Sequence, residues 1–415
     1  MSQYDLISTG FYGNTTPEEL VQKYGSPLYV YNEAVLRERC KEMRNLVSCP
    51  NFKVQYSAKA NSNKELLKII RSEGLHTDAM SPGEIFIMLQ SGYHPEEIFF
   101  VANNASEEEM QYVIDAGILV SVDSLSQLQM YGRLNPGGRV AVRINAGAGV
   151  GHHEKVITAG KKTKFGVNAD LIPEIKQIAE QYKLRIVGLN QHLGSLFMEP
   201  DGYIAGAQAL LSVAEQFENL EFVDFGGGFG IPYRKHSGEQ RLDLEALGSE
   251  LSAIVQDWTA QYGQDIAFHT EPGRYIVAES SVLLGKVNAI KHNGTTKFVG
   301  TDVGFNVLAR PVMYDSWHDL EFYRNGSRLD GYQLELATIT GNICESGDII
   351  AKDREVPIIE EGDICGILDT GAYGFAMSSN YNNRLRPAEV LIRTDGSPEL
   401  IRRRDTLEDL LRNYE

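Results

Sequence analysis

The feature that most constrains the fold is a regular alternation of short apolar runs with amphipathic stretches between about residues 53 and 271. Each apolar run has the length of a buried strand, and the stretches between them carry apolar residues at helical spacing. Strands that alternate with helices form parallel βαβ units. Eight such runs over about 220 residues predict a (β/α)8 barrel, with an open doubly wound sheet as the alternative. The runs are at residues 53–57, 75–78, 98–101, 118–122, 139–144, 185–191, 221–225 and 266–270.

After residue 275 the pattern changes to short β-rich runs separated by turn residues such as Asn-Gly. We therefore predict a barrel over residues 31–275 and a β-rich domain over 276–415, to which residues 1–30 contribute. The predicted strands are at residues 281–290, 296–300, 332–340, 363–368 and 388–393.

The charge balance limits the partners that the chain can have. Among 415 residues, 39 Lys and Arg stand against 56 Asp and Glu, a formal net charge of −17. This argues against nucleic acid or an anionic membrane as a partner, because both require a basic face. The chain has no apolar run long enough for a transmembrane helix and no signal-peptide pattern at its start. Its four cysteines form no Cys-x-x-Cys pair and are interpreted as thiols in a reducing cytoplasm. The histidines show no metal-ligand spacing, so we expect no metal.

Polar residues follow several of the predicted strands, and in a barrel the active groups sit at the carboxyl ends of the strands. Lys59 follows the first strand and Asp78 ends the second. His192 ends the sixth, and a run of glycines at 226–230 follows the seventh. Glu271 follows the eighth. These residues are therefore the first candidates for a functional site.

The glycine run Gly226-Gly-Gly-Phe-Gly230 allows backbone N–H groups to approach an anion closely. Barrels often bind phosphate with the loops after strands seven and eight. A dinucleotide-binding fingerprint does not fit, because its last glycine would fall on Ile231. A phosphate loop and a simple tight turn both remain open at this point.

Lys59 stands between apolar residues at a strand end, although a single lysine is usually a solvated surface residue. A partly buried lysine can form a Schiff base with an aldehyde. A phosphate cradle and an aldehyde-trapping lysine together suggest pyridoxal phosphate. Glu271 is then the natural carboxylate to face the pyridine nitrogen of that cofactor.

At this point a series of motifs resembles the diaminopimelate decarboxylase family, which belongs to the barrel-type (fold type III) pyridoxal-phosphate decarboxylases. The resemblance spans nearly the whole chain and implies a (β/α)8 barrel of alanine-racemase type with an all-β C-terminal domain. The motifs are Tyr56-Ser-Ala-Lys-Ala-Asn61, His192-Leu-Gly-Ser195, Gly226–Gly230, Glu271-Pro-Gly-Arg274, Arg310-Pro-Val-Met-Tyr314 with His318, Gly341-Asn-Ile-Cys-Glu-Ser346 with Asp348, Asp369-Thr-Gly-Ala-Tyr373, Tyr381-Asn382 and Arg386-Pro387.

The resemblance implies how the cofactor would be held. Lys59 would carry it through its amine, and His192 would stack on its ring. Glu271 would bind the pyridine nitrogen, and Asp78 would lie near the lysine amine. The other cofactor contacts would come from Ser195, Gly227, Gly228, Gly273, Arg274 and Tyr373.

The resemblance also implies the substrate, meso-2,6-diaminopimelate, which would be decarboxylated to L-lysine and CO2 in the last step of lysine biosynthesis. Cys344 would donate the proton that replaces the carboxylate, and Glu345 would bind the distal ammonium. The distal carboxylate would be bound by Arg274, Arg310 and Tyr314, with Tyr373 also in contact. Guanidinium groups suit this role because they grip a carboxylate in two parallel bonds. The resemblance also implies a head-to-tail homodimer, in which the Cys344–Glu345 segment completes the partner's site.

Two alternatives remain from the sequence. A relative of the same fold could decarboxylate ornithine, carboxynorspermidine or a pathway-specific amino acid. A non-catalytic cofactor-binding regulator is disfavoured because Lys59 and Cys344 are both present. The long Gly- and Lys-rich stretch at 146–164 is expected to be a mobile lid.

Overall fold

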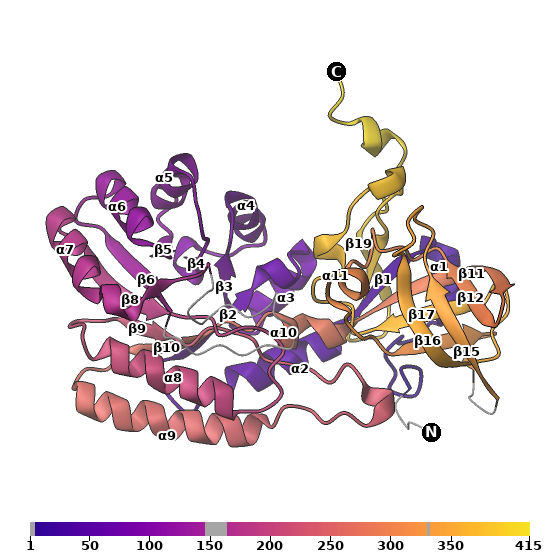
Figure 1. Cartoon of the computed structure of the whole chain (residues 1–415), viewed down its shortest axis with the longest axis horizontal. Helices are drawn as coiled ribbons and strands as arrows, with labels where there is room; N and C mark the ends of the chain where they lie inside the picture. Colours follow the sequence, from indigo (N-terminus) through magenta and orange to yellow (C-terminus); the bar gives the residue numbers. More distant parts are fainter. Residues whose placement is uncertain (1–4, 146–163, 330–332) are drawn as a thin grey trace. The chain divides into compact units, whose positions relative to one another are not determined.

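The computed structural model describes residues 5–145, 164–329 and 333–415 (Figure 1). Apart from Lys164, the predicted lid lies outside these residues. The chain forms two compact units. The first, here the β unit, comprises Met1–Arg37, Pro232–Gln240 and Val277–Glu415. The second, here the barrel unit, comprises Glu38–Ile231 and Arg241–Ile276.

Eight parallel strands close into a ring in the barrel unit. The order of pairing is β5-β4-β3-β2-β10-β9-β8-β6, and β5 also pairs with β6, which closes the barrel. This confirms the predicted (β/α)8 barrel and excludes the open sheet. The strands are β2 (Phe52–Ser57), β3 (His76–Ala79), β4 (Ile98–Phe100), β5 (Leu119–Val122), β6 (Arg139–Asn145), β8 (Arg185–Asn190), β9 (Phe222–Asp224) and β10 (Ala267–Thr270), with a short β7 (Val167–Asn168) beside β6.

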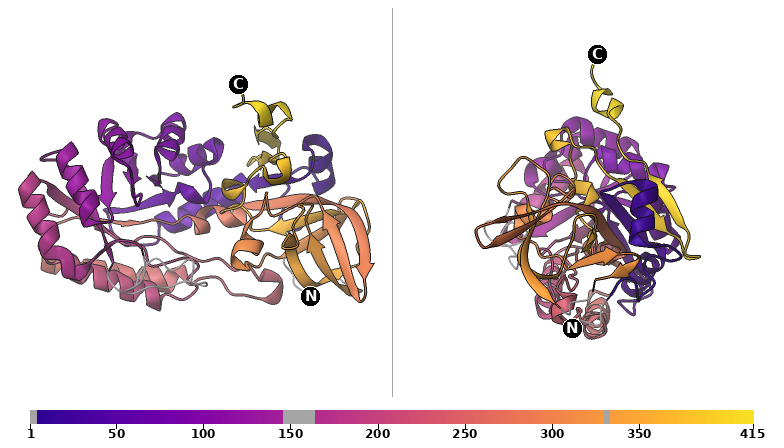
Figure 2. Two further views of the ribbon diagram at one scale, coloured as in Figure 1. Left: turned by 45° about the horizontal axis from the view of Figure 1, so that its top comes forward. Right: turned by 90° about the vertical axis from the view of Figure 1, so that its right-hand side faces the viewer.

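Helices surround these strands, and α8 and α9 run side by side (Figures 1 and 2). Side-chain caps start several of them. Ser106 accepts a hydrogen bond from the N–H of Glu109, whose carboxylate accepts from the N–H of Ser106, a complete capping box. The helices are α3 (Lys64–Ser72), α4 (Pro82–Gln90), α5 (Glu107–Asp115), α6 (Leu125–Leu134), α7 (Ile172–Tyr182), α8 (Asp201–Ala214) and α9 (Leu244–Tyr262); α2 (Glu33–Arg44) and α10 (Arg274–Val277) lie at the chain crossings between the units.

The β unit is built on a mixed sheet whose main path is β14-β13-β17-β11-β1-β18-β19, with β12, β15 and β16 attached through β11. The N-terminal strand β1 pairs antiparallel with β11 and parallel with β18. Apolar residues of these three strands form the core of the unit. The strands are β1 (Leu28–Asn32), β11 (Ser281–Asn293), β12 (Thr296–Thr301), β13 (Leu320–Arg324), β14 (Ser327–Arg328), β15 (Leu334–Thr340), β16 (Ile349–Pro357), β17 (Ile364–Leu368), β18 (Ala388–Ile392) and β19 (Pro398–Arg402); the helices are α1 (Pro17–Tyr24) and α11 (Arg310–Tyr314).

The segment Pro232–Gln240 belongs to the β unit, although the sequence prediction placed it in the barrel. Ion pairs and a hydrogen bond to residues of the β unit explain this assignment. The Lys235 ammonium is buried and lies 3.0 Å from a Glu279 carboxylate oxygen and 2.5 Å from one of Asp369. The backbone N–H of His236 donates to the carboxylate of Asp319. These contacts fix the segment to the β unit immediately after the glycine loop that follows β9.

Within the described part of the chain, no helix combines the length and the apolar character that crossing a membrane requires.

Candidate active site

Lys59 is presented at the carboxyl end of β2. The strand ends at Ser57, and a single 3-10 turn, Ala58–Ala60, carries the lysine. The Ser57 N–H donates to the carbonyl of Pro272, just after β10, and the Ser57 hydroxyl donates to a carboxylate oxygen of Asp78 on β3, at 2.7 Å. The turn is thereby joined to both neighbouring strand ends, and the partly buried lysine lies at the predicted position.

Three buried carboxyl groups, those of Asp78, Asp224 and Glu271, lie at neighbouring strand ends. Burial raises the pKa of Asp78 well above its usual range, and the charge of Glu271 raises it further. Burial also raises the pKa of Asp224 to about 7 and the pKa of Glu271 well above its ordinary value. The charge of Asp224 is a further cause of the raised pKa of Glu271, so the protonation of each of these two carboxyl groups depends on the other.

Two cations, Lys59 and Arg143, stabilise the ionised forms of these carboxylates and so offset part of the cost of burial. Arg143 lies on β6, is buried, and stacks its guanidinium over the ring of Phe165 at 4.7 Å. Sequence reasoning missed Arg143 and Asp224. The available signal was a charge inside an apolar strand, which is rare unless that charge has partners.

His192 is a neutral imidazole in this site. Burial lowers its pKa well below the ordinary value, and the charges of Lys59 and Arg143 lower it further. The backbone N–H of Gly227 donates to His192 Nδ1 at 3.2 Å, so the ring proton lies on Nε2. A neutral ring beside the glycine loop suits flat stacking on an aromatic cofactor.

The glycine loop approaches neighbouring backbone so closely that side chains are excluded. A Cβ at Gly226 would lie 2.1 Å from the Gln191 carbonyl oxygen, and one at Gly227 would lie 1.9 Å from that of Glu271. At Gly228, where φ is +111°, it would lie 2.5 Å from the Gly194 oxygen. Only glycine fits such positions. The conformation of the glycine loop therefore depends on close contacts between its backbone and the backbone of neighbouring segments.

Two further predicted residues meet beside this loop. The Arg274 guanidinium donates through Nη2 to the Ser195 hydroxyl at 2.9 Å, and Arg274 is buried. Gly273 packs its Cα against Ser57, where a Cβ would come within 3.0 Å of the serine Cβ. The structure thus brings together, in the barrel unit, all the predicted cofactor contacts except Tyr373.

The arrangement fits pyridoxal phosphate. One Glu271 oxygen and one Asp78 oxygen are buried without a hydrogen-bond partner in the described part of the chain. Buried polar atoms normally have partners, so these two mark a site for a polar ligand. A lysine amine, a buried carboxylate, a neutral imidazole and a glycine cradle are the groups that this cofactor requires. Across the described ranges, no cluster of three His, Cys, Asp or Glu side chains could hold a metal ion.

The other predicted residues lie in the β unit. Arg310 and Tyr314 begin and end α11, and Arg310 is only 2% exposed. Tyr373 adopts a left-handed backbone conformation with φ of +58° after β17. Cys344 is exposed and free, with its N–H bound to Asn382 Oδ1 at 2.7 Å. The carboxylate of its neighbour Glu345 accepts a bond from the Tyr381 hydroxyl at 3.3 Å.

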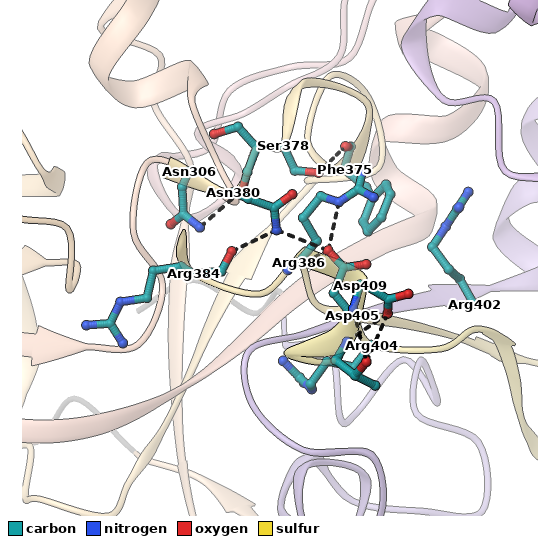
Figure 3. Close-up of polar contacts among 12 residues, drawn as sticks. Asn306, Phe375, Ser378, Asn380, Arg384, Arg386, Arg402, Arg404, Asp405 and Asp409 are labelled. Carbon is teal, nitrogen blue, oxygen red and sulfur yellow. Dashed lines mark hydrogen bonds and ion pairs between the residues drawn. The ribbon is translucent and has the colours of Figure 1, made fainter. Parts of the chain in front are cut away.

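The loop that supports Cys344 is held by the C-terminal segment of the chain. Figure 3 shows Asn380 between the backbone carbonyl of Arg384 and the carboxylate of Asp405. Arg386 donates to the same carboxylate through its backbone N–H and Nε. The segment around Asp405 therefore fixes the loop that carries Asn382. No sequence signal connected these distant segments.

Comparison with known proteins places these observations in one family. Residues 33–278 match the pyridoxal-binding domain of the pyridoxal-dependent decarboxylases. The diaminopimelate decarboxylase of Methanothermobacter thermautotrophicus is 40% identical over 409 residues, which cover 96% of this chain and 94% of that protein. That of Escherichia coli K12 is 34% identical, with 98% of each chain covered.

Solved structures agree. A crystal structure of diaminopimelate decarboxylase superposes with a TM-score of 0.89 at 32% identity and covers 97% of this chain and 98% of that one. The Helicobacter pylori diaminopimelate decarboxylase complexed with L-lysine gives a TM-score of 0.87 at 29% identity, with 95% of this chain and 98% of that one covered. This chain therefore belongs to the diaminopimelate decarboxylase family of pyridoxal-phosphate-dependent enzymes.

Proposed function

We propose that this protein decarboxylates meso-2,6-diaminopimelate to L-lysine and CO2. The observation that carries the proposal is the meeting of Lys59, the buried carboxyl of Glu271 and the glycine loop at one end of a closed barrel. Family membership narrows the substrate, since relatives that match nearly the whole chain bear the name diaminopimelate decarboxylase.

Pyridoxal phosphate, when bound, supplies a sink for the electrons that the departing CO2 leaves behind. Lys59 would hold the cofactor through its side-chain amine. The carboxyl group of Glu271, whose pKa is raised by burial and by the charge of Asp224, would face the pyridine nitrogen. Neutral His192 stacks against the ring without adding a positive charge.

The phosphate of the cofactor is bound by neutral donors in this proposal. The backbone N–H groups of Gly227 and Gly228 can reach an anion because no side chain stands in front of them. The Ser195 hydroxyl, already bound to Arg274, and the backbone at Gly273 complete the cradle. Asp78, held by Ser57, stays close to the Lys59 amine.

Most of the proposed substrate contacts belong to the β unit, whereas Arg274 belongs to the barrel unit. The planar guanidinium of Arg310 binds the distal carboxylate in two parallel bonds, with Arg274, Tyr314 and Tyr373 as further contacts. Glu345 binds the distal ammonium, and the Cys344 thiol protonates the α-carbon. We propose that this segment acts in the site of a second copy of the chain, as a homodimer. The thiol role requires a reducing compartment, and we propose the cytoplasm; Cys344 forms no disulfide.

The test is CO2 release by purified protein with added pyridoxal phosphate. meso-Diaminopimelate, L-lysine, L-ornithine and L-arginine would be offered separately, with a Lys59→Ala variant as the control for cofactor-dependent chemistry. Release from diaminopimelate alone supports the proposal. Release only from ornithine or lysine would keep the chemistry and overturn the substrate and the roles of Arg310 and Glu345.

A further inference from the structure

Arg310 is held inside the β unit by two aromatic side chains. Its Nη1 lies 2.7 Å from Nε2 of His318, which is itself 3% exposed. Its guanidinium carbon lies 4.6 Å from the centre of the Tyr233 ring, within the range of a cation–π contact. The Tyr233 ring also meets the His318 ring edge-on, at 5.2 Å. The three side chains form one packed cluster, here the Arg310 clamp.

The partners of His318 determine where its ring proton lies. On one side, His318 Nδ1 lies 2.6 Å from the backbone carbonyl oxygen of Leu368, which can only accept, so Nδ1 carries a hydrogen. On the other side, Arg310 can only donate, so Nε2 carries none. Both contacts require the same neutral tautomer. The ring therefore works as a rigid connector between a strand carbonyl and the guanidinium.

This connector fixes the orientation of the guanidinium plane. Nη1 is tied to the end of β17 through His318, while the Tyr233 ring packs against the guanidinium. Because the planar guanidinium is hydrogen-bonded through one nitrogen and packed against a ring on one face, it cannot rotate freely. Bidentate binding of a carboxylate depends on that orientation.

We propose that His318 is a positioning residue that sets the Arg310 guanidinium for the distal carboxylate of the substrate. It thereby gives the enzyme its preference for a diamino acid with two carboxylates. This inference rests on the proposed function, since it assigns a role within the same substrate site.

The test compares His318→Leu with His318→Gln. Leucine removes both hydrogen bonds, whereas glutamine can donate to the Leu368 carbonyl and accept from Arg310. We expect His318→Leu to raise the KM for meso-diaminopimelate about tenfold or more while kcat changes less than about threefold, the pattern of lost substrate binding. We expect the KM of His318→Gln for meso-diaminopimelate to lie within about threefold of the wild-type value. His292→Leu, the same change at an exposed position of the same unit, is the control.

An unchanged KM in His318→Leu, or an equal rise in both His318 variants, would overturn the positioning role. A second measurement does not depend on activity. Nitrogen-15 NMR of the histidine rings should show His318 protonated on Nδ1 alone. A ring protonated on Nε2 would refute the clamp. If the wild type fails to decarboxylate diaminopimelate, the proposed function fails, and the ring spectrum alone then decides whether the clamp is as described.

Discussion

Replacing Asp224 by asparagine should make the cofactor-free protein more stable at high pH. Asparagine keeps the acceptor for the Gly226 N–H, whose nitrogen lies 2.8 Å from Asp224 Oδ1, and it removes the ionisable group. Burial raises the pKa of Asp224 from the ordinary 3.8 to about 7. The folded protein therefore retains a proton that the unfolded chain releases, so this stabilisation is complete below pH 3.8 and is lost as the pH rises through about 7.

The size of the effect follows from the same values. The difference between 3.8 and about 7 corresponds to about 4 kcal/mol, at ~1.36 kcal/mol for each tenfold change in acidity. Because Asp224 and Glu271 influence each other's titration, we expect only about half, ~2 kcal/mol, to be recovered in Asp224→Asn at pH 8, and almost none near pH 4.

Urea unfolding of both proteins between pH 4 and pH 8 measures this difference directly. Asp170→Asn, the same change at an exposed position of the barrel unit, should show no such trend. The reasoning is refuted if Asp224→Asn is no more stable than the wild type at pH 8, or if its advantage is as large at pH 4.

Three other substitutions test separate parts of the structure. Gly227→Ala would place a Cβ 1.9 Å from a carbonyl oxygen and should abolish cofactor uptake in an absorbance titration, whereas Gly83→Ala, where the nearest atom is 3.7 Å away, should bind cofactor normally. Lys235→Met leaves two buried carboxylates without their ammonium and should cost about 3–5 kcal/mol; an unchanged melting temperature would contradict this. Cys344→Ala should keep the cofactor and slow turnover by about 10²-fold or more, whereas Cys365→Ala should turn over normally. A full rate in Cys344→Ala would exclude the thiol as the acid.

The barrel could be predicted from sequence because its strands are buried on both faces. Such strands appear as continuous apolar runs, and all eight predicted runs overlap the observed strands. The β unit was harder. Strand β16, Ile-Ile-Ala-Lys-Asp-Arg-Glu-Val-Pro, carries charges through its middle, and among the described strands it pairs with β15 alone, so its hydrophobic signal is weak. β13 and the largely exposed β19 were missed as well.

In the candidate site, too, some residues could be predicted from the sequence and others could not. Residues at strand ends, such as Lys59 and Glu271, could be found from their position alone. Asp224 and Arg143 could not, because their importance depends on a proton and on charges contributed by other strands. His318 was part of a recognised motif, but its role depends on the backbone carbonyl of Leu368, fifty residues away.

The way the chain crosses between the units has a consequence for its synthesis on the ribosome. All of the barrel unit is present once Ile276 has been made, whereas the β unit is assembled from the two ends of the chain and the short segment Pro232–Gln240. Tyr31 on β1 bonds to Glu389 on β18, 358 residues later. At roughly 5–20 residues per second, β1 waits about 20–70 s for that neighbour. The apolar strand Leu-Tyr-Val-Tyr-Asn can pair with β11 before then, but its other edge stays unpaired until β18 is made. We therefore expect this edge to need protection by a chaperone during synthesis.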